Sequence, residues 1–234
     1  MAAQLLEVDK ELPTDWLDRL RRHLRSTPDH ELAHCFYGGP LAQMPQRLRA
    51  ELAASLPEPL QAAAVLVPIV LRAEGPKLLL TVRASNLRHH AGQISFPGGR
   101  VEPGDPDLAA AALRETSEEL GIAPTFIEPL GYLTDHVVPT GFRITPVVGL
   151  LRGGFTLTLD QTEVAEAFEV PLDFALATTN YRARRRTLRE VEMEVWELSY
   201  GEHVIWGATA GMLAQLRSVL HSSREPSSAG GPTA

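Results

Sequence analysis

The segment GGRVEPGDPDLAAAALRETSEELGI, residues 98–122, joins a glycine-rich turn to a short acidic helix. Asp105 followed by Pro106 predicts the helix start, because aspartate is a good N-terminal cap and proline is accepted in the first turn. Gly121 predicts the helix end, since glycine adopts the left-handed conformation that closes many helices. Four residues at helical spacing are expected to face a core: Ala109, Leu113, Thr116 and Leu120.

Three glutamates, Glu115, Glu118 and Glu119, lie at the C-terminal end of this helix. They fall within roughly 100° of one another around the helix axis. This is unfavourable, because each forgoes ~0.3–1 kcal/mol of helix-dipole energy and like charges three or four residues apart repel. A solvated acidic face is the simplest interpretation. The glycine-rich turn and the strict spacing favour a bound Mg²⁺ or Mn²⁺ instead, and with it metal-assisted attack on a phosphate ester or anhydride.

Composition narrows the class of protein. The chain has 234 residues, of which 44% are hydrophobic and 22% charged, as in ordinary globular proteins. A net charge of −7 argues against unaided binding to nucleic acid or to an anionic membrane. The first residues lack a basic stretch followed by an apolar core, and the longest apolar run, 62–71, is too short to cross a bilayer. We therefore expect a cytoplasmic protein without a membrane or nucleic-acid partner, with a homodimer as one option.

Strand and helix patterns alternate along the chain, which predicts an α/β sandwich. The loop at 84–104 is too long for a simple connection, so it is a candidate functional loop. The expected strands are 64–71, 77–83, 126–134, 143–151 and 191–199, and the expected helices besides the acidic one are 13–24, 42–56 and 206–220. We divide the chain into an N-terminal helical extension (1–57), a catalytic domain (58–222) and a disordered tail (223–234).

The acidic segment resembles the Nudix box, G-x5-E-x7-REUxEExGU, in which U is an aliphatic residue. Matching positions are Gly99, Arg114, Glu115, Glu118, Glu119, Gly121 and Ile122. Asp105 stands where the box has glutamate, one residue further from Arg114, and Thr116 replaces the aliphatic residue. We interpret Asp105 as the helix cap, with an ion pair to Arg114 as the alternative.

The preceding segment, LLTVRASNLRHHAGQISFPGG at 79–99, resembles the signature of the coenzyme A diphosphatase branch of Nudix hydrolases. Its matching positions are Arg83, Ala84, Arg88, Gly92, Phe96, Pro97, Gly98 and Gly99. That branch also tends to have the aspartate and the added residue in its box. The resemblance extends over about residues 60–215.

The resemblance implies an α/β/α sandwich with a mixed sheet that hydrolyses coenzyme A to 3′,5′-ADP and 4′-phosphopantetheine. It implies that the cation, Mg²⁺ or Mn²⁺, is held by Glu115, Glu118, Glu119 and the Gly98 carbonyl. The same box glutamates and Arg114 are the candidate catalytic residues. Arg83 and Arg88 are the candidates for binding the substrate phosphates, since a planar guanidinium matches phosphate well.

Three questions stay open at this point. The general base could be Glu119 or a downstream acid, Glu163 or Glu166, whose simplest interpretation is an exposed helix start. The basic stretch 182–189 could attract a substrate phosphate, although a solvated turn is the simpler interpretation. The function could also be hydrolysis of another nucleoside diphosphate derivative or a nucleoside triphosphate, or catalytically idle nucleotide binding.

Overall fold

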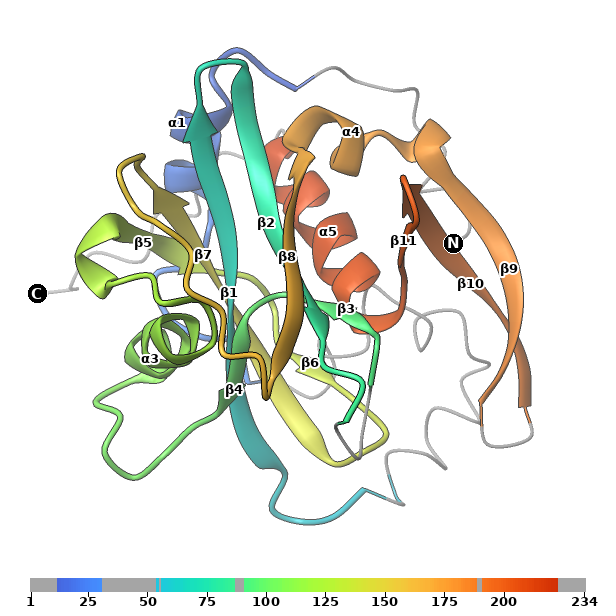
Figure 1. Cartoon of the computed structure of the whole chain (residues 1–234). Coiled ribbons are helices and arrows are strands. Elements are labelled where there is room, and N and C mark those ends of the chain that lie inside the picture. Colours follow the sequence, from blue (N-terminus) through green and yellow to red (C-terminus); the bar gives the residue numbers. More distant parts are fainter. Residues whose placement is uncertain (1–11, 31–53, 55, 87–90, 189–190, 223–234) are drawn as a thin grey trace, which may run out of the picture.

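The computed structural model describes residues 12–30, 54, 56–86, 91–188 and 191–222 (Figure 1). The predicted tail and nearly all of the predicted helix at 42–56 lie outside these residues. The described residues form two β-sheets and the helices that cover them.

The larger sheet carries the fold. Its strands in the described chain are β1 (Gln61–Arg72), β2 (Gly75–Arg83), β3 (Ile94–Ser95), β4 (Gly98–Arg100), β5 (Ile127–Tyr132), β6 (His136–Val137), β7 (Phe142–Leu151) and β8 (Val164–Pro171). Five follow the order β3-β2-β1-β7-β5, while β4 pairs with β1, β6 with β7 and β8 with β2. β1 and β7 run parallel and the other pairs are antiparallel, so the sheet is mixed, as predicted.

Helices lie on both faces of this sheet. Their bounds are α1 (Trp16–His23), α3 (Leu108–Leu120), α4 (Leu172–Leu176) and α5 (Gly207–Leu220), with short 3₁₀ turns at η3 (Pro124–Phe126) and η4 (Thr178–Asn180). A smaller sheet has the order β11-β10-β9 and consists of β9 (Tyr181–Leu188), β10 (Val191–Tyr200) and β11 (His203–Ile205). Figure 1 shows α3 on one side of the large sheet and α5 on the other. The predicted α/β sandwich is confirmed.

Side chains alternate between the two faces of the large sheet, so the core consists of two clusters, one on each face. Leu66 and Val70 of β1 point toward α3, where they pack with Ala112. Val67 and Ile69 of the same strand point toward α5 and belong to the second cluster. Thr116 and Leu120 of α3 are buried, and Ala109 and Leu113 are partly buried against the same cluster. The residues predicted to face a core therefore do so.

The N-terminal segment contributes to the core. α1 packs against α5, and its Leu20 is fully buried in the cluster on that face. After α1 the chain follows the β5–β6 connection through backbone bridges from Arg25 to Tyr132 and from Asp29 to Thr134. The described part of the predicted extension is thus joined to the large sheet.

Two predicted local structures are wrong. Glu163 and Glu166, whose simplest interpretation is an exposed helix start, lie directly before and within strand β8, which pairs along β2. Residues 182–188, interpreted as a turn, belong to strand β9, which pairs with β10. Both segments lack clean apolar alternation, and their conformation comes from backbone pairing with a partner strand. The long loop at 84–104 also contains β3 and β4.

No helix in the described chain is both long enough and apolar enough to cross a membrane.

Candidate active site

The acidic helix α3 starts two residues later than predicted. Asp107 is its N-cap, and its Oδ1 accepts a hydrogen bond from the Ala110 N–H at 2.7 Å. The predicted cap at Asp105 is therefore wrong, because the Asp105 carboxylate is occupied elsewhere. The predicted end at Gly121 is confirmed, with φ of 69° in the left-handed region.

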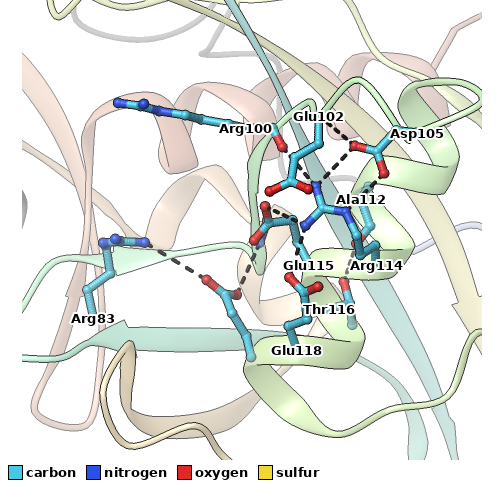
Figure 2. A network of polar contacts seen from close by, with 11 residues as sticks. Arg83, Arg100, Glu102, Asp105, Ala112, Arg114, Glu115, Thr116 and Glu118 are labelled. Atoms are coloured by element: carbon cyan, nitrogen blue, oxygen red, sulfur yellow. Dashed lines mark hydrogen bonds and ion pairs between the residues drawn. The ribbon is translucent and has the colours of Figure 1, made fainter.

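Arg114 is the centre of an ion-pair network, and its contacts with labelled acids are drawn in Figure 2. Its Nε and Nη2 donate to the two carboxylate oxygens of Asp105 at 2.9 and 3.0 Å. Its Nη1 donates to Glu115 at 3.1 Å and to Glu118 at 2.9 Å. These contacts lower the pKa of Asp105 and raise that of Arg114. The alternative interpretation of Asp105, an ion pair to Arg114, is the one found.

Glu119 is the buried member of the acidic group, with 3% of its surface exposed. Its Oε2 accepts a hydrogen bond from the Gly98 N–H at 3.1 Å, and its Oε1 lies 4.0 Å from Nη1 of Arg83. Burial raises the pKa of Glu119 to about 8, against the lowering effects of Gly98 and Arg83. Without a cation, this carboxyl is therefore largely protonated at neutral pH.

The two other glutamates are more exposed. Burial raises the pKa of Glu115, although its hydrogen bond from Arg114 acts in the opposite direction. Glu118 has 58% of its side chain exposed and contacts Arg114 from the solvent side. The three glutamates predicted to act together therefore lie at different depths: Glu118 is the most exposed, Glu115 is intermediate and Glu119 is the most buried.

Gly98 and Gly99 bring the strand β4 close to these acids. A Cβ on Gly99 would lie 2.5 Å from the carboxyl carbon of Glu115, so glycine leaves room for that side chain in its present position. Gly98 has φ of 149°, and a Cβ there would meet the Ala64 carbonyl oxygen at 2.4 Å. In the β1–β4 pairing, Leu66 N–H donates to the Pro97 oxygen. The polar backbone groups of the next residue, Gly98, therefore point away from β1, and its N–H donates to Glu119.

Downstream acids differ in their relation to this site. Glu163 is exposed, and its charge is close enough to raise the pKa of both Glu115 and Glu119. Its carbonyl oxygen accepts a hydrogen bond from the Ala84 N–H at 2.8 Å, which fixes it beside the end of β2. Glu166 instead contacts Nε2 of His203 at 3.3 Å. Of the two downstream candidates, Glu163 therefore joins the acidic group and Glu166 does not.

Arg83, one of the two predicted phosphate-binding arginines, lies at the end of β2 beside Glu119. The other, Arg88, lies outside the described residues. Sequence reasoning left Glu163 undecided, because nothing local in its segment indicates that β8 pairs with β2 and brings this residue to α3.

Comparison with known proteins identifies the family. The family model for the NUDIX domain matches residues 60–196, which include β4, α3 and Glu163. The chain belongs to the Nudix family. Among curated relatives, the "Uncharacterized Nudix hydrolase NudL" of Enterobacter sp. (strain 638) is 44% identical over 154 residues, covering 66% of this chain and 80% of the relative. The protein of the same name from Cronobacter sakazakii is 45% identical over the same coverage.

Solved Nudix structures resemble the chain more distantly. A MutT/nudix family protein from Enterococcus faecalis is 19% identical with a TM-score of 0.46, covering 79% of this chain and 73% of that one. The NUDIX domain of Shewanella oneidensis NrtR complexed with ADP ribose is 21% identical with a TM-score of 0.39, covering 55% and 84%.

Nudix hydrolases generally use a divalent cation, so the fit of the acidic group to one can be tested. Within the described residues, no three histidine, cysteine, aspartate or glutamate side chains converge closely enough to hold a metal ion. The reason is visible in the contacts: Arg114 binds Glu115 and Glu118, while Glu119 faces Gly98. The chemistry fits nevertheless, because a buried carboxyl with a raised pKa gains most from a cation. Holding it requires Glu115 and Glu118 to bring carboxylate oxygens together with Glu119, in competition with their contacts to Arg114.

Proposed function

We propose that this Nudix hydrolase is a Mg²⁺- or Mn²⁺-dependent pyrophosphohydrolase that cleaves coenzyme A or a derivative into 3′,5′-ADP and 4′-phosphopantetheine. The observation that carries the proposal is the placement of the buried Glu119 between the Gly98 N–H and the Arg83 guanidinium. Both residues belong to the segment 79–99, whose pattern resembles the coenzyme A diphosphatase branch. This segment therefore supplies two of the groups around the innermost acid.

The box residues supply the cation site in this proposal. Glu115, Glu118 and Glu119 would hold the cation with the carbonyl of Gly98. The cation, when bound, polarises a phosphate oxygen and lowers the pKa of the attacking water. Arg114 would then keep its bidentate contact with Asp105, which anchors the middle of α3 to the turn before the helix.

Arg83 has a different role in the proposal. Its guanidinium is close enough to Glu119 to reach a phosphate placed against the acidic group, and planar N–H groups suit the two oxygens of one phosphate. Binding there orients the pyrophosphate and offsets the negative charge of the surrounding acids. Arg88 remains a second candidate for the same task.

Glu163 is the proposed proton acceptor. It lies within electrostatic range of Glu115 and Glu119 yet comes from another segment, so it can take a proton from water while the box acids hold the cation. Glu163→Gln is expected to lower kcat by about 100- to 10,000-fold, the usual contribution of a general base. Glu166→Gln is the matched control, because its carboxylate contacts His203 instead. Equal losses in both variants would contradict the assignment.

Product analysis tests the proposed substrate. Purified protein is incubated with coenzyme A and Mn²⁺ in water enriched in oxygen-18, and the products are separated and weighed by mass spectrometry. Recovery of 4′-phosphopantetheine and 3′,5′-ADP identifies the cleaved bond, and the labelled product identifies the attacked phosphorus. ADP-ribose and GTP are compared under the same conditions.

The rival functions give different results. Faster cleavage of ADP-ribose or GTP than of coenzyme A would reject the coenzyme A assignment and leave a Nudix hydrolase with another substrate. Metal-dependent binding of coenzyme A without any product would favour a nucleotide-binding domain that has no turnover.

A further inference from the structure

Arg100 is fixed beside the acidic group but is not part of it. It follows Gly99 in strand β4, and its carbonyl oxygen accepts a hydrogen bond from Nη2 of Arg114 at 2.9 Å. Because Arg114 also binds Glu115 and Glu118, the Arg100 backbone is held at a defined position relative to these acids.

The Arg100 side chain points in another direction. A Cβ on Gly99 would point at the Glu115 carboxylate, and successive residues of a strand project to opposite faces. Arg100 accordingly lies over the ring of Phe142 in β7, with its Cζ 5.2 Å from the ring centroid. Figure 2 shows its side chain extending away from Glu115 and Glu118, whereas Arg114 points at them.

This guanidinium is available for an anion. Arg100 is exposed, and within the described residues no carboxylate forms an ion pair with it, in contrast to Arg114 and to Arg72 with Glu169. A contact of the guanidinium carbon over an aromatic ring leaves the N–H groups that do not face the ring able to donate to phosphate oxygens. Phe142 therefore orients the Arg100 guanidinium and leaves N–H donors available to a ligand.

We infer that Arg100, oriented by Phe142, binds a substrate phosphate that lies outside the pyrophosphate and thereby sets a preference for a nucleotide with a third, ribose-bound phosphate. The inference rests on the proposed function and deepens it. Arg83 lies beside Glu119 and suits the pyrophosphate. Arg100 instead projects from the face of β4 opposite to the one that Glu115 approaches. Coenzyme A carries such a third phosphate on the 3′ oxygen of its ribose, and 3′-dephospho-coenzyme A lacks it.

The other exposed basic group is less suitable. Arg182, Arg184 and Arg185 lie on β9 of the smaller sheet. Figure 1 shows the β9–β10 hairpin on the far side of the large sheet from α3. A phosphate bound there would be separated from the acidic helix by the sheet and α5, so these arginines are useful as controls.

The test compares coenzyme A with 3′-dephospho-coenzyme A for the wild type and for three variants with Mn²⁺. Arg100→Gln is expected to raise KM for coenzyme A by about 10- to 100-fold, because one charge-assisted contact is lost, and to leave the values for the dephospho substrate nearly unchanged. Phe142→Leu is expected to shift the ratio in the same direction by a smaller factor. Arg185→Gln removes an exposed charge from β9 and is expected to behave as the wild type.

The results distinguish failure of the Arg100 inference from failure of the proposed coenzyme A hydrolysis. If the wild type cleaves coenzyme A and Arg100→Gln changes both substrates equally, or neither, this inference is overturned and the proposed function stands. If the wild type cleaves neither substrate, the proposed function fails and the inference fails with it. Unchanged turnover of the dephospho substrate also shows that the variant is folded.

Discussion

The Gly98 N–H donates to the Glu119 carboxylate at 3.1 Å, which joins the glycine-rich strand to the acidic helix across 21 residues of sequence. This single backbone bond and a distant Arg83 do not compensate for burial, so the pKa of Glu119 is raised to about 8. In the proposed function, a bound cation would favour release of this proton.

Removing the charge of Glu119 should lower activity without lowering the stability of the metal-free protein. Glu119→Gln is expected to lower kcat by at least about 100-fold, because loss of this proposed cation ligand would remove several kcal/mol of transition-state stabilisation. In the presence of EDTA, the melting temperature is expected to equal or exceed that of the wild type, since glutamine still accepts the Gly98 hydrogen bond. Turnover assays and thermal unfolding by fluorescence check both. A strongly destabilised or fully active variant would mean that Glu119 is structural.

The metal-free protein should lose stability as the pH rises. Glu119 has a pKa of about 8 in the folded protein and 4.5 as the reference for the unfolded chain. Between these values the unfolded chain has released the proton and the folded protein retains it, so ionisation favours unfolding. Each pKa unit corresponds to about 1.4 kcal/mol, which sets a loss of several kcal/mol between pH 4.5 and 8. Urea unfolding in EDTA measures it.

Glu119→Gln is the control for this pH dependence, because histidines titrate in the same interval. The difference between the two unfolding curves isolates Glu119 and is expected to be near zero at pH 4 and largest above pH 8. Saturating Mn²⁺ should reverse the trend for the wild type alone. A pH-independent difference would show that the raised pKa has no bearing on stability.

Arg114 should contribute more to the stability of the metal-free protein than to that of the protein with bound Mn²⁺. Arg114→Gln leaves Asp105, Glu115 and Glu118 without their shared cation and is expected to lower the free energy of unfolding by ~1–3 kcal/mol in EDTA. Mn²⁺ is expected to recover part of the loss, because it neutralises the two glutamates. Denaturant unfolding with and without Mn²⁺ measures this. Asp105→Asn, which keeps Arg114 and both glutamates, should show no comparable recovery.

Substitution of the two adjacent glycines should affect different properties, namely fold stability for Gly98 and Mn²⁺ binding for Gly99. Gly98→Ala is expected to destabilise the fold by ~1–3 kcal/mol, because its Cβ meets the Ala64 backbone, which has no room to move. Gly99→Ala contacts only the movable Glu115 side chain and should mainly weaken Mn²⁺ binding. Calorimetric titration with Mn²⁺ and thermal unfolding distinguish the two. Equal effects of both substitutions on stability would contradict this division.

A buried acid outside the active site should be purely structural. Asp135 is fully buried, accepts a hydrogen bond from Thr145 Oγ1 at 2.7 Å, and contacts His30 Nδ1 at 2.7 Å. Asp135→Asn is expected to lower the free energy of unfolding by ~2–4 kcal/mol with little change in kcat. Thr145→Val removes one hydroxyl and should cost ~1 kcal/mol. Urea unfolding and turnover of the folded fraction test this, and a large fall in kcat would implicate Asp135 in catalysis.

Short-range sequence patterns were sufficient to predict the end of the box helix and the positions of the central strands. The helix end at Gly121 and the buried strands β1, β2 and β7 are set by a left-handed glycine and by apolar runs, which act within a few residues. The helix start was misplaced because two aspartates, Asp105 and Asp107, are equally good caps. The choice between them depends on Arg114, nine residues away, which binds the carboxylate of the first.

The sequence by itself determined the family, the acidic group and its glycine-rich neighbour, because box spacing and helical periodicity are properties of one continuous segment. Only the tertiary structure decided that Glu119 is buried, that Glu163 joins it while Glu166 faces His203, and that Arg100 lies over Phe142. These relationships depend on β8 pairing with β2 and on β1 lying between β4 and β7. Such pairings join residues far apart in the chain, so their free energy comes from contacts that no local pattern contains.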